Sequence, residues 1–474
     1  MPLFTVEEVL EITSGRLLSG ISFRQLKSGV RRLSTDSRDI RAGDLFVALK
    51  GERYDGRTFV GDAVKRGALG AILQGNGWTG ELPAGRSSKA AAAIMVGVPD
   101  PLIAYQQLAA HHRSRFRIPL VAVTGSNGKT TTKEMVARVL AERGSVLKTE
   151  GNLNNRIGVP QTLLGLARAH KAAVIEMGVD QKGQTARLCE IARPTIGLIT
   201  NIGPDHLQFF GSMEGSAQAK GELLEYLPAD GAIVLNADDA YYEYLASRAQ
   251  CRIVSFGLSE SAQVRATDVQ ADARRGQTFT LQLPGETRAT KVMLPAHGLH
   301  NLSNALAAAA VGHAQGLSGA TIAKGLARFK PAAMRSQVVT ARGIRIINDA
   351  YNANPASMKA AIALLAEMAN GGRTIAVLGD MLELGAEEQA MHQDVGTYVA
   401  THGISVLVAC GGLSRHIAQG ARAAGIAAAR VHEVADSAAA AAAARRLARA
   451  GDVVLVKGSR GMKMEKVVER LTEK

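Results

Sequence analysis

Cysteine, aromatic residues and long apolar stretches are all scarce in this chain of 474 residues. Its three cysteines, Cys189, Cys251 and Cys410, stand far apart without CxxC spacing, which argues against a disulfide framework and against a thiolate zinc site. We expect them to be reduced and buried. Aromatic residues make up only 4% of the chain, which leaves little for stacking on nucleic-acid bases. No run of about 18 apolar residues occurs, so we expect no membrane insertion.

A basic leader and a basic tail are also missing. The chain opens with MPLFTVEEVLEITSG, which has acidic residues where a signal peptide needs basic ones, so we expect a cytoplasmic protein. The net charge of +14, from 56 basic and 42 acidic residues, is spread thinly along the sequence. We therefore predict no nucleic-acid partner and expect anionic small molecules as ligands.

The length and the pattern of apolar runs predict an α/β protein of three domains. One hydrophobic core stops growing at roughly 250 to 300 residues, so 474 residues need several. Short apolar runs alternate with helix-like stretches throughout, which is typical of parallel sheets covered by helices. We predict a small N-terminal α/β domain at 1–112, a central mononucleotide-binding P-loop domain with a mainly parallel sheet at 113–330, and a C-terminal doubly wound, Rossmann-like domain at 331–474.

The segment VAVTGSNGKTTTKEM at 121–135 carries the sharpest chemical signal. A buried strand leads into a glycine turn and a helix that begins at Lys129, so backbone N–H groups can donate to phosphate oxygens. Lys129 supplies a charge for the β and γ phosphates, and the Thr130 hydroxyl can bind Mg²⁺. Val123 stands where a full Walker A motif has its first glycine. The predicted ATP contacts here are Thr124, Gly125, Ser126, Asn127, Gly128, Lys129, Thr130 and Thr131.

Two further strand ends carry polar residues that suit a metal. Glu176 ends the apolar run in AVIEMG, and a carboxylate at such a place needs a cation or donors to compensate it. Asp205 and His206 follow the next apolar strand and should lie at the same edge of the sheet. A single histidine is usually structural, so the spacing alone leaves the role of His206 open.

Five motifs follow one another along the chain: TGSNGKTTT at 124–132, EMG at 176–178, NI..DH at 201–206, AKGEL at 219–223 and GLHNLSNALAA at 298–308. Together they resemble the Mur ligases, the ATP-dependent amide-forming enzymes of peptidoglycan precursor synthesis. The resemblance covers essentially the whole chain. It implies an enzyme of the bacterial cytoplasm.

Further segments resemble the family members that join D-alanyl-D-alanine to UDP-N-acetylmuramoyl-tripeptide. They are DSR at 36–38, GDLFVALKGERYDG at 43–56, GNLNNRIGVPQTLL at 151–164, NDAYNANPASM at 348–358 and LGDMLELG at 378–385. The implied reaction activates the tripeptide carboxylate with the γ-phosphate of ATP as an acyl phosphate. The amine of D-Ala-D-Ala then attacks to give a tetrahedral intermediate, and UDP-MurNAc-pentapeptide, ADP and phosphate follow.

The resemblance also implies the catalytic and metal-binding residues. The catalytic set would be Lys129, Glu176, His206 and Lys220. Thr130, Glu176, His206 and Lys220 would hold two Mg²⁺ ions, with Lys220 modified to a carbamate because an ammonium has no lone pair for a metal. Without the family, Lys220 would be interpreted as a surface lysine paired with Glu222 or Glu225.

Further contacts come from the same resemblance. The nucleotide would also be held by Asn301, Asn304, Arg335, Asp349 and Asn352. The expected contacts to the UDP-sugar, the peptide arm and the dipeptide are Ser34, Asp36, Ser37, Arg38, Asn152, Asn154, Asn155, Lys457, Ser459 and Arg460. An ordinary turn would explain the first four equally well. Arg156 stands where the family leads us to expect an acidic residue.

Two alternatives remain open from the sequence. One is another amide ligase of the superfamily, similar to MurE or to a folylpolyglutamate-type enzyme. The other is a P-loop NTPase that acts as a binding switch. The sequence predicts a monomer but does not fix whether the third residue of the tripeptide is meso-diaminopimelate or L-lysine.

Overall fold

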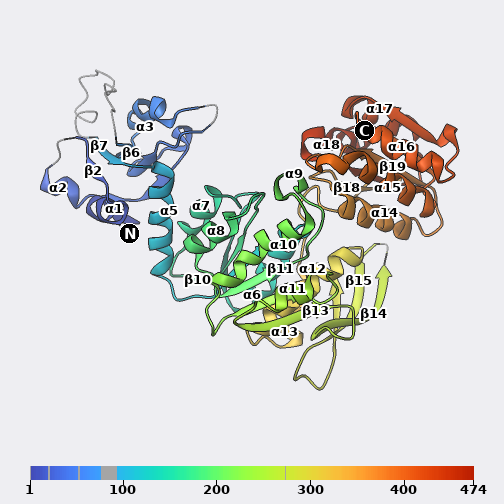
Figure 1. Ribbon diagram of the computed structural model, residues 1–474, viewed down its shortest axis with the longest axis horizontal. Helices are drawn as coiled ribbons and strands as arrows, with labels where there is room; N and C mark the ends of the chain where they lie inside the picture. The colour runs from blue at the N-terminus through green and yellow to red at the C-terminus, as the bar shows by residue number, and fades with distance from the viewer. Residues whose placement is uncertain (1, 20–21, 52–53, 76–92, 273, 474) are drawn as a thin grey trace.

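Three sheets organise the chain into three bodies (Figure 1). The computed structural model describes residues 2–19, 22–51, 54–75, 93–272 and 274–473. The N-terminal and C-terminal bodies lie on opposite sides of the central one in Figure 1. The predicted α/β class with three domains is confirmed, while the exact boundaries at residues 112 and 330 stay a prediction.

The N-terminal body is a five-stranded sheet in the order β2-β7-β6-β5-β4, parallel except for β2. Its strands are β2 (Arg16–Leu17), β4 (Arg32–Ser34), β5 (Asp44–Val47), β6 (Gly70–Gln74) and β7 (Ile94–Val98), and β1 (Phe4–Thr5) pairs separately with β3 (Gly29–Val30). The helices are α1 (Val6–Thr13), α2 (Phe23–Leu26) and α3 (Val60–Lys65). Helix α5 (Pro101–Ser114) leads into the central body and starts with an Asp100 cap and a proline in its first turn.

The central body holds a nine-stranded sheet in the order β16-β15-β14-β13-β12-β11-β8-β10-β9. Its strands are β8 (Leu120–Thr124), β9 (Ser145–Lys148), β10 (His170–Glu176), β11 (Ile196–Ile199), β12 (Ala232–Asn236), β13 (Arg252–Gly257), β14 (Val264–Asp272), β15 (Gly276–Gln282) and β16 (Thr290–Leu294). The pairs from β9 to β14 are parallel, as predicted, but β15 and β16 add an antiparallel edge that the sequence pattern did not reveal.

Helices cover both faces of this sheet, which explains why its inner strands consist of apolar residues without alternation. One face packs against α6 (Lys129–Leu140), α12 (Leu299–Ala314) and α13 (Gly319–Ala327). The other face meets α5, α7 (Gly158–Leu163), α8 (Gln184–Ala192), α10 (Met213–Gly221) and α11 (Tyr242–Ala246), with the short α9 (Leu207–Phe210) beside α10. Helix α10, which carries Lys220, ends at Gly221, and a 3₁₀ helix continues the chain from Glu222 to Tyr226.

The C-terminal body is a doubly wound sheet in the order β17-β18-β22-β19-β20-β21. Its strands are β17 (Gln337–Ala341), β18 (Ile344–Asp349), β19 (Thr374–Gly379), β20 (Val406–Cys410), β21 (Val431–Val434) and β22 (Val453–Lys457). Helices α14 (Pro355–Ala369), α15 (Glu388–Thr401) and α16 (Ser414–Ala423) cover one face, and α17 (Ser437–Leu447) and α18 (Glu465–Thr472) cover the other. The strands β18 to β22 are parallel, as predicted for a doubly wound domain, and β17 is an additional antiparallel edge.

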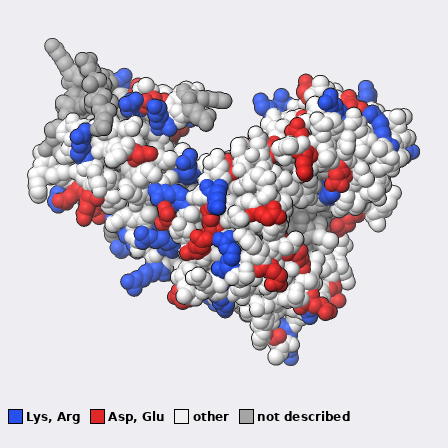
Figure 2. All heavy atoms as spheres, in the orientation of Figure 1, with Lys and Arg blue, Asp and Glu red and all other residues white. Residues whose placement is uncertain are grey.

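Charges are mixed on the surface, and two of the three cysteines are buried as expected. On the face drawn in Figure 2, basic side chains lie among acidic ones and form no continuous basic band. Cys189 and Cys410 are buried and Cys251 is half-buried, and all three are free thiols. None of the described helices is long and apolar enough to cross a bilayer.

The ring of Phe256 lies in the core between the central sheet and helices α6 and α12, with no exposure. Replacement by alanine leaves a cavity, so Phe256→Ala should destabilise the central body by about 3–5 kcal/mol. Val269→Ala is the matched control on the same sheet, because Val269 on β14 is 39% exposed. Urea unfolding followed by circular dichroism should show a large shift for the first variant and almost none for the second; equal shifts would contradict this assignment of the core.

Candidate active site

A cleft of about 780 Å³ opens between the central and the C-terminal bodies. The carboxyl ends of β8, β10 and β11 form one wall, and those of β18 and β22 contribute to the other. The predicted site residues that line the cleft are Ser126, Asn127, Gly128, Lys129, Thr130, Thr131, Asn154, Asn155, Glu176, His206, Asn301, Asn304, Arg335, Asp349, Asn352 and Lys457. Residues far apart in the sequence therefore meet at two facing sheet edges, where open α/β sheets bind ligands.

The loop between β8 and α6 has the geometry of a phosphate-binding loop. Gly125 and Gly128 both have positive φ, of +133° and +80°. A Cβ on Gly125 would lie 2.0 Å from the Thr200 hydroxyl oxygen, and one on Gly128 would lie 2.3 Å from Oδ1 of Asn304. Only glycine fits at either place, so the amino end of α6 stays open to an anion.

Neighbouring side chains fix this loop. The Thr200 hydroxyl donates to the carbonyl of Asn127 at 2.6 Å, and Asn201 accepts from the Asn127 N–H at 3.0 Å. The Lys129 ammonium donates to the carbonyls of Gly125 at 2.6 Å and Ser126 at 3.2 Å. It therefore already lies against the loop that would hold the phosphates.

Glu176 ends β10 beside this loop and has an unsatisfied oxygen. Its Oε1 accepts from the Thr130 hydroxyl at 3.1 Å and from the Asn154 amide at 2.9 Å. Its Oε2 is buried without a hydrogen-bond partner, and the nearest cation, Lys133, lies 3.8 Å away. A buried carboxylate oxygen without a donor is costly, so the pair of Thr130 and Glu176 fits a bound cation.

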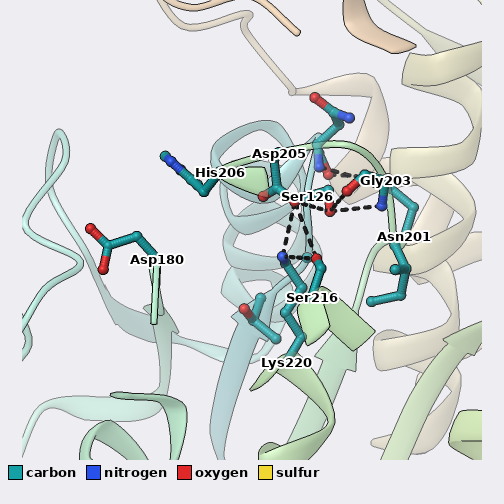
Figure 3. Close-up of polar contacts among 12 residues, drawn as sticks. Ser126, Asp180, Asn201, Gly203, Asp205, His206, Ser216 and Lys220 are labelled. Carbon is teal, nitrogen blue, oxygen red and sulfur yellow. Dashed lines mark hydrogen bonds and ion pairs between the residues drawn. The ribbon is translucent and has the colours of Figure 1, made fainter. Parts of the chain in front are cut away.

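Lys220 lies inside the protein and contacts Asp205, as Figure 3 shows. Its ammonium donates to Oδ1 of Asp205 at 3.0 Å and to the Ser216 hydroxyl at 2.6 Å, and it lies 4.5 Å from the ring centre of Phe210. The side chain is only 1% exposed. Burial lowers the pKa of Lys220 to about 8 even though Asp205 opposes the shift.

The alternative interpretation of Lys220 as a surface lysine is wrong. The carboxylate of Glu222 instead accepts from the backbone N–H groups of Gly183 and Ala186 at 2.6 and 3.0 Å, at the start of α8. Glu225 instead pairs with Arg248 at 2.7 Å. The partner of Lys220 is a residue from the end of a neighbouring strand.

The four predicted metal-binding residues fall into separate groups. Thr130 and Glu176 are hydrogen-bonded to each other, whereas Lys220 lies with Asp205. The imidazole of His206 points away from Lys220 in Figure 3, and its Nδ1 lies 2.6 Å from Oε2 of Glu383. In the described part of the chain, no three His, Cys, Asp or Glu side chains form a metal-binding cluster. Bound phosphates or a carbamate would have to complete any metal site.

Three further residues predicted to contact the nucleotide have contacts of their own, two of them on α12 of the central body and one just before β17. Asn301 donates to the carbonyl of His297 at 2.8 Å, and Asn304 accepts from the Thr132 hydroxyl at 3.1 Å. The guanidinium of Arg335 stacks on the Tyr351 ring at 4.0 Å from its centre.

Asp349 and Lys457 form a buried ion pair at the edge of the C-terminal sheet. The Lys457 ammonium donates to Oδ2 of Asp349 at 2.5 Å. It also donates to the carbonyl of Asn352 at 2.9 Å. Burial pushes the pKa of Asp349 upward, but the Lys457 ammonium holds it below its usual value. Lys457 therefore stabilises the loop around Asn352 in addition to lining the cleft.

Other predicted contacts do not line this cleft. Thr124 ends β8, Gly125 is the first residue of the loop, and Lys220 is buried on α10; none of the three is among the residues that line the cleft. Asp36 accepts from the Arg38 guanidinium at 2.7 Å, and the Ser34 hydroxyl donates to the carbonyl of Asp36 at 3.1 Å. The remaining residues outside the cleft are Ser37, Asn152, Ser459 and Arg460. The roles assigned to these residues stay predictions.

Sequence analysis missed the side chains that connect the motifs. Asp205 accepts from the Ser126 hydroxyl of the P-loop at 2.5 Å as well as from Lys220. Its position directly before His206 was noted, but the pattern gave no sign that it would contact two other motifs. Glu383 and His206 contact each other although they are 177 positions apart in the chain, and no sequence pattern near either residue indicates this.

A P-loop at one sheet edge, a second α/β body across the cleft and a third body beyond define a nucleotide-dependent enzyme. Family models describe the same parts of the chain: "Mur ligase family, catalytic domain" at 30–113, "Mur ligase middle domain" at 123–312 and "Mur ligase, glutamate ligase domain" at 334–460.

Relatives and solved structures match over nearly the full length. The UDP-N-acetylmuramoyl-tripeptide--D-alanyl-D-alanine ligase of Bacillus subtilis is 37% identical over 99% of this chain and 98% of its own. A MurF crystal structure from Acinetobacter baumannii has a TM-score of 0.89 at 32% identity and 99% coverage of both chains. The MurF ligase of Thermotoga maritima in complex with ADP has a TM-score of 0.80 at 27% identity and covers 94% of this chain and 97% of its own. The chain belongs to the Mur ligase family, whose members are ATP-dependent ligases.

Because Gly128 lies close to Asn304, a substitution at Gly128 tests the nucleotide site. In Gly128→Ala the methyl group would meet the Asn304 amide and would also strain a residue at φ +80°. We expect at least a tenfold loss of ATP affinity in calorimetry, with unchanged far-ultraviolet circular dichroism. Gly183→Ala is the control, because Gly183 has a similar φ of +83° with no neighbouring atom within 4 Å of its added Cβ. Equal ATP affinity in Gly128→Ala and the parent would contradict the site.

Proposed function

We propose that this protein is the ligase that joins D-alanyl-D-alanine to UDP-N-acetylmuramoyl-tripeptide with cleavage of ATP to ADP and phosphate. The product is UDP-N-acetylmuramoyl-pentapeptide, a precursor of peptidoglycan. The observation that carries the proposal is the full-length similarity to relatives named for this reaction, at 37% identity in Bacillus subtilis and 38% over 93% of the chain in Escherichia coli.

The cleft suits a reaction that brings two anions together. The tripeptide carboxylate must approach the γ-phosphate of ATP, so the main task of the protein is to neutralise charge and to hold both groups in line. The amino end of α6 and the Lys129 ammonium provide positive charge at one place. The amine of D-Ala-D-Ala then displaces phosphate from the activated carboxylate.

Two Mg²⁺ ions and a carbamate at Lys220 complete the proposal. Bound Mg²⁺ supplies charge neutralisation at the phosphate oxygens. Thr130 and Glu176 would hold one ion, which is supported by the unsatisfied Oε2 of Glu176. His206 and a carbamylated Lys220 would serve the second. The lowered pKa of Lys220, about 8, supports this modification because the neutral amine is the form that adds CO₂.

The three bodies would divide the substrates. We assign the UDP-sugar to the N-terminal body through Ser34, Asp36, Ser37 and Arg38, and the peptide arm to the segment with Asn152, Asn154 and Asn155. Arg335, Asp349 and Asn352 would contact the nucleotide from the C-terminal body, whereas Lys457, Ser459 and Arg460 would lie near the peptide or the incoming dipeptide. We further propose a cytoplasmic monomer with no nucleic-acid partner.

The direct test measures ADP release by the purified protein with UDP-MurNAc-tripeptides that end in meso-diaminopimelate or in L-lysine. We expect release that depends on both the tripeptide and D-Ala-D-Ala, and mass spectrometry should identify the pentapeptide. Release with glutamate or diaminopimelate as the amine instead would favour another ligase of the superfamily. Salt-sensitive DNA binding with no substrate-dependent ADP release would favour an NTPase switch.

The role of Lys220 can be tested separately. Lys220→Ala should be nearly inactive, and acetate or formate should restore part of the activity by replacing the carbamate oxygens. Lys182→Ala is the control, since Lys182 is an exposed lysine on the same body. The parent protein should show a carbamate signal in ¹³C NMR after addition of labelled bicarbonate, and Lys220→Ala should not. Full activity of Lys220→Ala without added acids would overturn the carbamate.

A further inference from the structure

The segment LGDMLELG at 378–385 stands out in the sequence, yet the proposed reaction gives it no task. It runs from the end of β19 toward α15 in the C-terminal body, and its Glu383 contacts His206, which lines the cleft. Within it, Glu383 has a φ of +64°, in the left-handed region that a glutamate seldom adopts. Such a conformation persists only where surrounding contacts impose it.

The C-terminal body anchors this segment firmly on both sides of Glu383. The Ser459 hydroxyl accepts from the Leu382 N–H at 2.9 Å, and the Ser459 N–H donates to the carbonyl of Asp380 at 3.0 Å. The buried ring of His392 accepts from the Met381 N–H at 3.0 Å. Leu384 is buried as well. Glu383 is therefore carried on a fixed backbone rather than on a loose loop.

From this position Glu383 reaches across to the central body. Its Oε2 lies 2.6 Å from Nδ1 of His206, and its carbonyl lies 3.4 Å from the N–H of Gln208. His206 also has a left-handed backbone, with a φ of +50°. Two residues in unfavourable conformations thus meet across the domain boundary.

The chemistry of this contact decides which nitrogen of His206 carries a proton. A carboxylate can only accept a hydrogen bond, so Nδ1 must be the donor. In the neutral ring, Nε2 then keeps its lone pair. The ring of His206 projects away from the Asp205–Lys220 cluster in Figure 3, and both His206 and Asp180 line the cleft. Because Glu383 contacts Nδ1 and His206 lines the cleft, Nε2 is the ring nitrogen that can bind a ligand there.

We propose that Glu383 is a positioning residue that holds the His206 imidazole in one orientation and in its Nδ1–H tautomer. Because Glu383 belongs to the C-terminal body, the availability of Nε2 depends on where that body lies. His206 therefore has the orientation and tautomer needed to bind a cation or phosphate through Nε2 only when the two bodies are in contact. The proposal rests on the part given to His206 in the proposed function.

Ring tautomers can be measured without any substrate. Long-range ¹H–¹⁵N NMR on the full chain labelled with ¹⁵N-histidine, with His206→Gln used for assignment, should show Nδ1–H for His206 in the parent at pH 8. Glu383→Ala should lose this preference, whereas Glu383→Gln should keep it because the amide oxygen can still accept. Glu387→Ala is the matched control, since Glu387 lies four positions on and is exposed.

The kcat of the ligase reaction should fall in the variant that loses the Nδ1–H tautomer of His206. Loss of a carboxylate that orients a liganding histidine typically costs 10- to 100-fold, so we expect kcat of Glu383→Ala to fall by at least about tenfold while KM for ATP changes less than about twofold. Glu383→Gln should recover much of this loss.

Three outcomes would overturn the proposal: an unchanged His206 tautomer in Glu383→Ala, a loss of kcat without a change of tautomer, or an equal loss in Glu387→Ala. If the ligase assay itself fails with D-Ala-D-Ala, the proposed function fails, but the tautomer measurement still decides the role of Glu383.

Discussion

One buried carboxylate, Asp205, ties the phosphate-binding loop to the helix that carries Lys220. Its Oδ1 accepts from the Ser126 hydroxyl of the loop, from the Ser216 hydroxyl and from the Lys220 ammonium. Removing one partner of such a buried pair leaves an uncompensated charge and typically costs about 3–5 kcal/mol. The loop and α10 are therefore coupled, and a chemical change at Lys220 acts directly on the residue that holds the loop.

A second constraint is the meeting of two sheet edges across one cleft. The carboxyl ends of β8, β10 and β11 bring the P-loop, Glu176 and Asp205 together, and those of β18 and β22 bring Asp349 and Lys457 to the other wall. The walls are joined by few direct polar contacts; one is the Asn354 amide, which donates to the Asn127 side chain at 2.9 Å. A cleft between two bodies of this kind can close on anions and open to release them.

Local patterns of glycine turns, apolar strands and helix starts were enough to predict the P-loop and the α/β class. They also predicted that Glu176 ends a strand beside that loop. The antiparallel edges formed by β15 and β16 and by β17 were missed, because the direction of a strand depends on the remote segment with which it pairs. An apolar run does not show that partner. Asp205 and Glu383 were missed as partners for a different reason. Their contacts, with Lys220 and His206, form between segments that share no local signal.

The sequence by itself determined the family, the nucleotide loop and the division into three α/β bodies, because these depend on residues next to one another in the chain. Only the tertiary structure decided the state of individual side chains. It buried Lys220 beside Asp205, and the burial lowers the pKa of Lys220. It also brought Glu383 to His206 across a domain boundary. Both effects depend on burial and on distances between remote segments, and no local pattern contains that information.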